Sequence, residues 1–310
     1  MPSPRERRPR PRELSWIVHG MTSIGVAGWD YPDWSGIVYP RGASRGFDRL
    51  AWVARFLDVV EINATFYRPA APRVASTWIK RVSGNASFRF TAKAHRSWTH
   101  ETWDDAASVV APTLTGLAPL HESGLLGALL VQFPQSFHQT PDSRTRLARL
   151  LDVLSGWPVV VEVRHISWDD DRAAAWMHER DAGWCVVDQP RVGRSTAPPR
   201  QRVTAATAYL RLHGRNEAAW FDAAAGRDER YDYLYAMDEL APLAETARGM
   251  GASAKALYVI ANNHFRGQAF VNALQLKHLI QGVDPEAPDD LVAAYPDLTG
   301  VVAGKREKLF

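Results

Sequence analysis

The stretch VVVEVRHISWDDDRAAAWMHERDAGWCVVD, residues 159–188, contains the unit from which the fold is built. It contains two β-branched or aromatic runs, Val159–Arg164 and Trp184–Asp188, with a helix-like segment, Asp169–Arg180, between them. Short apolar strands that alternate with helical segments are typical of parallel sheets, in which helices connect one strand to the next. The stretch therefore predicts a strand–helix–strand unit whose strands end on polar residues.

The same unit recurs along the chain. Eight runs are expected to form strands: Ser23–Gly28, Val59–Asn63, Phe88–His95, Ala128–Gln132, Val159–Arg164, Trp184–Asp188, Ala208–His213 and Ala256–His264. The helices expected with them are Phe47–Leu57, Pro72–Val82, Asp104–His121, Ser143–Leu154, Asp169–Arg180, Tyr231–Met250 and Gly267–Gln281. Eight units in about 250 residues predict an α/β fold, the (β/α)8 TIM barrel, with its functional face at the C-terminal ends of the strands. The sixth unit is irregular, because the segment 189–204 carries three prolines and no helical period.

The charge of the chain is unevenly distributed. The 310 residues have a formal net charge of +3, and residues 1–13 hold this whole surplus with five arginines and two glutamates. We expect residues 1–20 to be a disordered tail rich in proline and arginine, and residues 21–310 to form one barrel domain. A barrel without net charge weakens the case for nonspecific nucleic-acid binding, which depends on clustered cations.

The sequence also bears on location. No apolar stretch approaches the roughly 20 residues that a membrane span needs, and residues 1–13 lack the apolar core of a secretory signal. Cys185 is the only cysteine, so an internal disulfide is excluded and a cytoplasmic location without membrane contact is expected. Cys185 itself is predicted to be a buried strand residue.

Side-chain alternation predicts which strand residues point into the barrel mouth. Successive strand residues face opposite sides, and the apolar parity should be covered by helices. The predicted inward set has three acids, three bases and a histidine: Glu61, Glu162, Asp188, Lys93, Arg164, Arg211 and His213. Such charges must be paired or face a water-filled pocket, since each would otherwise cost several kcal/mol. A charge-balanced plug is one interpretation. A ligand-binding mouth is favoured, because barrel interiors are normally filled by Val, Ile and Leu.

Other residues near the strand ends are candidates for ligand contacts. Arg215 follows Gly214 after the seventh run, where barrels commonly bind phosphate, although an arginine–carboxylate scaffold would also explain it. The remaining candidates offer amide, imidazole or aromatic groups: Asn63, Tyr67, Gln132, Trp168, Asn262, Asn263 and His264. Asparagines can instead cap loops, and aromatic rings can instead pack in the core. As a group with other rim aromatics such as Trp29, the rings favour a planar or cyclic ligand.

Neither a metal nor a cofactor is expected. Histidines occur near several strand ends, but without the His-x-His or His-x-x-x-His spacing of common metal sites. Three cations on the same face would also oppose a divalent ion. The chain has no phosphate-cradling Gly-x-x-x-x-Gly-Lys motif and no Gly-x-Ser-x-Gly motif.

Seven motifs in order along the chain resemble the YecE-like family, also called domain of unknown function 72. They are GVAGWDY (25–31) with YP (39–40), VEINATFY (60–67), FTAK (90–93), QFP (132–134), EVRH (162–165) with Trp168, RLHGR (211–215) and NNH (262–264). The resemblance implies a TIM barrel without an agreed activity and a distant likeness to the sugar-isomerase and endonuclease IV barrels. Asp30 and Ala64 stand where serine is expected, and Ile166 stands where proline is expected. These departures leave the charged inward residues in place.

Three functions are consistent with these observations. The first is an enzyme of hydrolase or isomerase type that acts on a phosphorylated or sugar-containing ligand, with Glu61 or Glu162 as acid or base and His213 as proton shuttle. In it, Lys93, Arg211 and Arg215 would stabilise an anion. The alternatives are a nucleic-acid-binding or nucleic-acid-processing barrel, and a noncatalytic module that binds a small anion or a protein partner.

Overall fold

The computed structural model describes residues 20–191, 193, 195, 198–220 and 226–304. Eight parallel strands close into a barrel in sequence order, with β8 paired to β1. The strands are β1 (Met21–Ala27), β2 (Val59–Ile62), β3 (Arg89–Lys93), β4 (Leu126–Gln132), β5 (Val159–Glu162), β6 (Gly183–Asp188), β7 (Thr207–Leu212) and β8 (Ala256–Ala261). The predicted α/β barrel is confirmed. Apart from Gly20, the expected tail lies outside the described residues.

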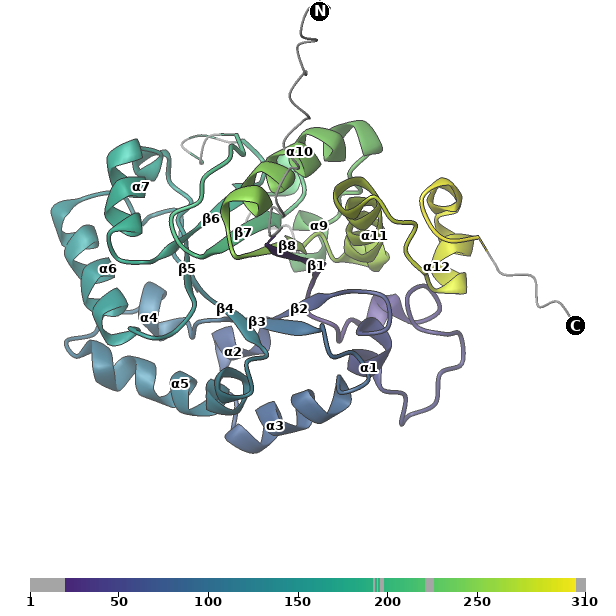
Figure 1. The fold of residues 1–310 in the computed structure, drawn as a ribbon, viewed down its shortest axis with the longest axis horizontal. Coiled ribbons are helices and arrows are strands. Elements are labelled where there is room, and N and C mark those ends of the chain that lie inside the picture. The colour runs from purple at the N-terminus through teal and green to yellow at the C-terminus, as the bar shows by residue number, and fades with distance from the viewer. Residues whose placement is uncertain (1–19, 192, 194, 196–197, 221–225, 305–310) are drawn as a thin grey trace, which may run out of the picture.

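Helices surround the strands (Figure 1). They are α1 (Arg49–Val53), α2 (Ala64–Tyr67), α3 (Pro72–Arg81), α4 (Ser97–His100), α5 (Ala106–Glu122), α6 (Pro141–Val153), α7 (Asp171–His178), α8 (Glu217–Trp220), α9 (Arg227–Arg230), α10 (Met237–Ser253), α11 (Gln268–Gln281) and α12 (Asp289–Ala294). Short 3-10 turns are η1 (Pro32–Trp34), η2 (Ile166–Trp168), η3 (Phe265–Gly267) and η4 (Pro296–Gly300). Between β6 and β7 the described residues form no helix, as the irregular sixth unit predicts.

Local capping explains where several helices begin. Asp48 and Asp105 accept hydrogen bonds from the first free backbone N–H groups of α1 and α5. Thr140 caps α6 in the same way, and Pro141 follows it at the first helical position. The predicted helix Tyr231–Met250 begins later, at Met237. The residues before it, which include Tyr231, Tyr233 and Tyr235, are therefore not part of the helix, and Tyr231 lies at the barrel mouth.

The inside of the barrel combines an apolar cluster with polar side chains that gather toward the C-terminal ends of the strands. The apolar interior cluster consists of Ala27, Val59, Ala128, Leu130, Val160, Cys185, Val187, Tyr209, Tyr258 and Ile260. The opposite strand faces pack against the helices, with Ile62, Val161 and Leu210 fully buried there. Cys185 is buried, as expected. The polar end of the interior therefore rests on an ordinary packed core.

The barrel requires glycine at position 25. A Cβ atom there would lie 1.8 Å from the backbone oxygen of Val59, which belongs to the paired strand β2. Since two paired strands cannot separate freely, we expect Gly25→Ala to lower the free energy of unfolding by about 3 kcal/mol or more. Urea unfolding measures this loss. Gly84→Ala is the control, because a Cβ at Gly84 meets no atom within 4 Å; similar unfolding midpoints for both variants would contradict the prediction.

Candidate functional site

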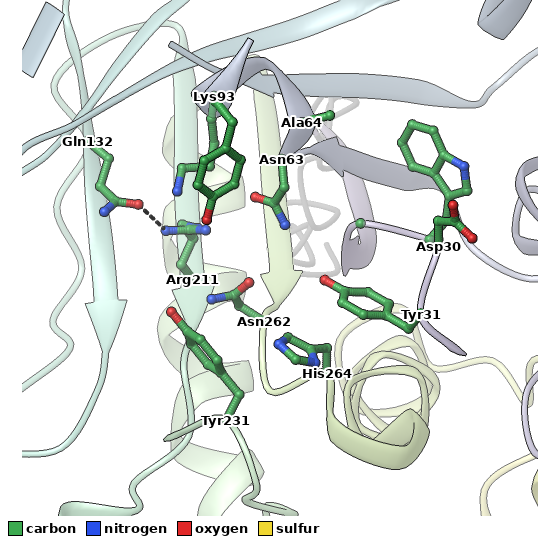
Figure 2. A pocket seen from close by; sticks show the side chains of 13 residues that line it. Asp30, Tyr31, Asn63, Ala64, Lys93, Gln132, Arg211, Tyr231, Asn262 and His264 are labelled. Carbon is green, nitrogen blue, oxygen red and sulfur yellow. Dashed lines mark hydrogen bonds between the residues drawn. The ribbon is translucent and has the colours of Figure 1, made fainter. Parts of the chain in front are cut away.

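A cavity of about 320 Å³ opens at the C-terminal ends of the strands, and we call it the mouth cavity (Figure 2). Its lining residues are Gly28, Trp29, Asp30, Tyr31, Asn63, Ala64, Tyr67, Lys93, Gln132, Arg211, Tyr231, Asn262 and His264. The sequence predicted site roles for Asn63, Tyr67, Lys93, Gln132, Arg211, Asn262 and His264. Figure 2 shows Lys93, Asn63, Arg211 and Asn262 gathered on one side of the cavity, with Tyr31 and His264 beside them.

Arg211 is fixed between two buried glutamates. Its Nη1 donates to Glu162 Oε2 and its Nη2 donates to Glu61 Oε1, each at 2.6 Å. Both glutamate side chains are completely buried, and the arginine is 1% exposed. Burial alone would raise the pKa of Glu162, but the charges of Arg211 and Arg164 outweigh it and hold this pKa well below its ordinary value. The lowered pKa keeps Glu162 in its carboxylate form near neutral pH, in which it holds Arg211.

The other carboxylate oxygens of the two glutamates are also satisfied. Tyr209 Oη donates to Glu61 Oε2 at 2.9 Å, and Thr91 Oγ1 lies 2.7 Å from the same hydroxyl. Arg164 Nε donates to Glu162 Oε1 at 2.7 Å. With all four oxygens of the two glutamates bonded, each side chain of the network is held in position by its neighbours, which makes the network rigid. The floor of the mouth cavity is consequently preorganised.

His213 is a neutral side chain in this network. Its Nδ1 lies 2.9 Å from Asn262 Nδ2, and its Nε2 lies 3.3 Å from Arg164 Nη2 and 3.5 Å from Arg211 Nη1. Burial, followed by the charge of Arg211, lowers the pKa of His213 to about 3. An imidazole that is neutral at physiological pH cannot supply a proton from its charged form. Its position between the guanidinium groups and Asn262 makes it a link that orients Asn262.

Lys93 differs from the other charged residues of the mouth. Its Nζ lies 4.3 Å from the ring centroid of Phe66, and no carboxylate of the described residues forms an ion pair with it. Burial, then the charge of Arg211, lower the pKa of Lys93 to about 7, against the opposing effect of Glu61 and Glu162. A substantial fraction of this amine is therefore neutral near pH 7, and it lines the mouth cavity.

Asp188 does not point into the mouth, so the expectation of three inward acids is wrong. Its register partner is Leu212, which faces the helices, whereas its neighbour Val187 is aligned with Arg211 and belongs to the interior cluster. The Asp188 carboxylate accepts hydrogen bonds from Arg215 at 2.9 and 3.0 Å and from Tyr235 Oη at 2.6 Å. The inward set is thus two acidic residues, Glu61 and Glu162, and three basic residues, Lys93, Arg164 and Arg211.

Three other candidates lie outside the mouth cavity. Arg215 is bound by Asp188 and Glu239, which matches the scaffold interpretation of this residue. The Trp168 side chain is fully buried, and its Nε1 donates to the backbone oxygen of Phe137. Asn263 is also buried, and its amide donates to the backbone oxygen of Tyr233 and to Asn272. These three side chains bind or pack against other residues of the protein and do not line the mouth cavity.

Sequence reasoning assigned no ligand role to two aromatic residues of the lining. Tyr31 stacks on His264, with ring centroids 4.4 Å apart, and its hydroxyl donates to the Ala27 backbone oxygen at 2.6 Å. The Tyr231 ring centroid lies 5.1 Å from that of His264. Tyr231 was expected to begin a helix. The signal against that helix was the alternation of Tyr231, Tyr233 and Tyr235, which has a period of two.

The described residues contain neither a candidate metal site nor a candidate membrane-spanning helix. In residues 20–304, apart from the positions not described, no group of three or more His, Cys, Asp or Glu side chains is arranged to hold a metal ion. Over the same part of the chain, no helix is both long and apolar enough to span a membrane.

A closed parallel barrel with a polar cavity at the C-terminal ends of its strands places the chain in the class of (β/α)8 barrel proteins. The family model described as "Protein of unknown function DUF72" matches residues 23–291. The chain belongs to this DUF72 family.

Relatives and solved structures agree with this assignment. UPF0759 protein YunF of Bacillus subtilis is 27% identical over 279 residues, which cover 84% of this chain and 95% of YunF. UPF0759 protein YecE of Escherichia coli K12 is 27% identical over 178 residues, or 54% of this chain and 59% of YecE. A DUF72 family crystal structure from Thermotoga maritima has a TM-score of 0.76 and 32% identity, covering 84% of this chain and 99% of that one. A DUF72 family structure from Enterococcus faecalis has a TM-score of 0.75 and 27% identity, covering 87% and 99%.

Proposed function

We propose that this barrel is an enzyme that binds a small phosphorylated or sugar-containing anion in the mouth cavity and acts on it by acid–base chemistry. The observation that carries the proposal is the position of Lys93, an amine without a carboxylate partner among the described residues, on the lining beside the fixed guanidinium of Arg211. The pKa of about 7 matches the amine to proton transfer near neutral pH.

The lining suits a small polar ligand. A volume of about 320 Å³ lies at the lower end of the range of small-molecule sites. Asn63, Gln132 and Asn262 bring amide groups to the lining, and Tyr31 and Tyr231 bring aromatic rings. Tyr67 is 70% exposed at the cavity, where its ring can cover a bound molecule. Amides recognise hydroxyl groups, and aromatic faces pack against sugar rings.

In this proposal the site residues have other roles than those expected from the sequence. Glu61, Glu162 and His213 lie beneath the lining and hold Arg211 and Asn262 in place, so they act as positioning residues. Proton transfer falls to Lys93. Arg211 and Lys93 provide the positive charge that holds the anion and stabilises negative charge in the transition state.

Sulfate binding tests the site without a known substrate, because its charge is constant across the neutral range. We expect sulfate affinity to fall as pH rises through about 7, where Lys93 loses its proton. In Lys93→Met the affinity should be at least about tenfold weaker at pH 6 and independent of pH, as expected for the loss of one close charge pair. Isothermal titration calorimetry measures both effects.

A matched control and a turnover screen complete the test. Arg248→Gln removes an exposed cation on α10 and should leave sulfate binding unchanged. A screen of phosphorylated sugars should show turnover that is lost in Lys93→Met. Sulfate affinity that ignores both pH and the Lys93 substitution would overturn the proposal. Binding of single-stranded DNA in place of sulfate would favour the nucleic-acid alternative.

A further inference from the structure

We propose that Lys93 forms an imine with an aldehyde or ketone carbonyl of the substrate, so that the site takes small carbonyl compounds that also carry an anionic group. This inference rests on the proposed function, since the mouth cavity must first bind an anion. It narrows the substrate class from anionic sugars and phosphates in general to those with a reactive carbonyl.

The surroundings of Lys93 fit a nucleophile better than a structural cation. Both buried carboxylates of the mouth are bonded to arginines: Glu61 to Arg211, and Glu162 to Arg211 and Arg164. The Lys93 ammonium is left above the face of Phe66, a contact that does not block its access to the cavity. A lysine that served the scaffold would be expected to take one of those carboxylates itself.

Lys277 shows what a structural lysine looks like in the same protein. It lies on α11, its ammonium is 2.7 Å from Asp58 Oδ1, and it also donates to the backbone oxygen of Phe56 at 3.2 Å. Lys80 and Lys255 are exposed at the surface. Of the lysines that the structure describes, Lys93 is the one that lines the mouth cavity.

The protonation of Lys93 allows the reaction at neutral pH. Nucleophilic attack needs the neutral amine, which an ordinary surface lysine holds only in trace amounts near pH 7. Burial and the neighbouring Arg211 lower the pKa of Lys93 to about 7. The neutral fraction is then about a thousandfold larger than that of a lysine with an ordinary pKa.

The proposed step balances without any further reactant. The lone pair of Lys93 Nζ forms a C–N bond with the carbonyl carbon while the C=O π bond breaks, and a proton moves from nitrogen to oxygen to give a carbinolamine. The C–O bond then breaks, and the hydroxyl leaves as water with the remaining nitrogen proton. The products are one imine and one water, and nothing is oxidised or reduced. Beside Lys93, the buried Arg211 Nε donates no hydrogen bond to any described residue.

Borohydride trapping tests the inference directly. The full chain is incubated at pH 7.5 with dihydroxyacetone phosphate, a ketone that carries a phosphate, and then reduced with sodium borohydride. Peptide mass spectrometry should find the reduced adduct on Lys93 at least about tenfold more often than on Lys80, Lys255 or Lys277, because Lys93 lines the cavity that binds the phosphate and its pKa is lowered to about 7. Excess sulfate should protect Lys93, and labelling of Lys93 should rise with pH through about 7.

This experiment compares lysines within the wild-type chain, so it does not require any variant to fold. Lys93→Arg adds a second readout, because it keeps the positive charge but cannot form an imine; it should bind sulfate and show no adduct at position 93. Labelling of Lys93 no greater than that of Lys80, together with pH-dependent sulfate binding, would overturn the imine and leave the proposed function standing. Loss of both labelling and sulfate binding in the wild-type chain would overturn both.

Discussion

Replacement of Arg211 by methionine is expected to lower the free energy of unfolding by about 3–5 kcal/mol, the usual cost of removing one partner from a buried ion pair. The reason is that Glu61 and Glu162, both completely buried, would each lose a hydrogen bond of 2.6 Å and face one another without a compensating cation at the centre. A loss of this size is a large fraction of the stability of a typical domain. Urea unfolding followed by far-UV circular dichroism measures it.

A triple variant separates the charge effect from the loss of arginine packing. This variant combines Glu61→Gln, Arg211→Met and Glu162→Gln. The two new glutamine side chains can still accept the hydrogen bonds from Tyr209 and Arg164, and no buried carboxylate remains unpaired. We expect this variant to recover at least about half of the loss, because neutral replacements of buried ion networks are often tolerated. A triple variant less stable than Arg211→Met alone would show that uncompensated charge is not the cause.

Acidification is expected to destabilise the protein well before its carboxylates titrate. His213 has a pKa of about 3 in the folded chain and about 6.5 when unfolded, so the unfolded state binds a proton first as pH falls. The contribution of His213 to stability is therefore fully present above about pH 6.5 and declines by about 1.4 kcal/mol per pH unit below it, down to about pH 3. Glu162, whose folded pKa is also lowered, adds to the loss below about pH 4.5. Unfolding free energies between pH 7 and 4.5 measure this decline together with that of His100, whose pKa burial also lowers, so the His213 share is read from the difference between the wild-type chain and a His213 variant.

The matching variant is His213→Gln, which keeps a polar group beside Asn262 but removes the titration. Its stability should change much less between pH 7 and 4.5 than that of the wild-type chain. His278→Gln is the control for the loss of a histidine outside the buried network, because His278 pairs with Asp284 away from the barrel interior. An unchanged slope in His213→Gln would rule out the buried imidazole as the source.

The barrel and much of its mouth could be predicted because strand alternation is a geometric rule. It placed Glu61, Lys93, Glu162 and Arg211 correctly inside the barrel. Asp188 was misplaced because the residues before it, Trp184–Val187, are apolar at both parities, so alternation alone does not show which face of this strand points inward. In the structure Cys185 and Val187 occupy the inward positions of β6, and Asp188 faces outward.

The remaining features depend on tertiary contacts that no local pattern specifies. Trp168 follows a strand end, but the 3-10 turn η2 directs its ring onto Phe137 in the core. Tyr31 and Tyr231 reach the mouth cavity on loops whose paths depend on their packing against His264. Lys93 has no carboxylate partner because both glutamates bind Arg211. Composition and spacing do not show which of the basic residues the glutamates bind.

The two bonds that hold Arg211 also have a thermodynamic consequence for ligand binding. A free arginine side chain carries about 2 kcal/mol of rotamer entropy, which a flexible binding residue loses when it meets its ligand. Here Glu61 and Glu162 already confine both terminal nitrogens, so that loss has occurred during folding. An anion entering the barrel therefore meets a guanidinium that needs no further ordering, and more of the contact energy is available as affinity.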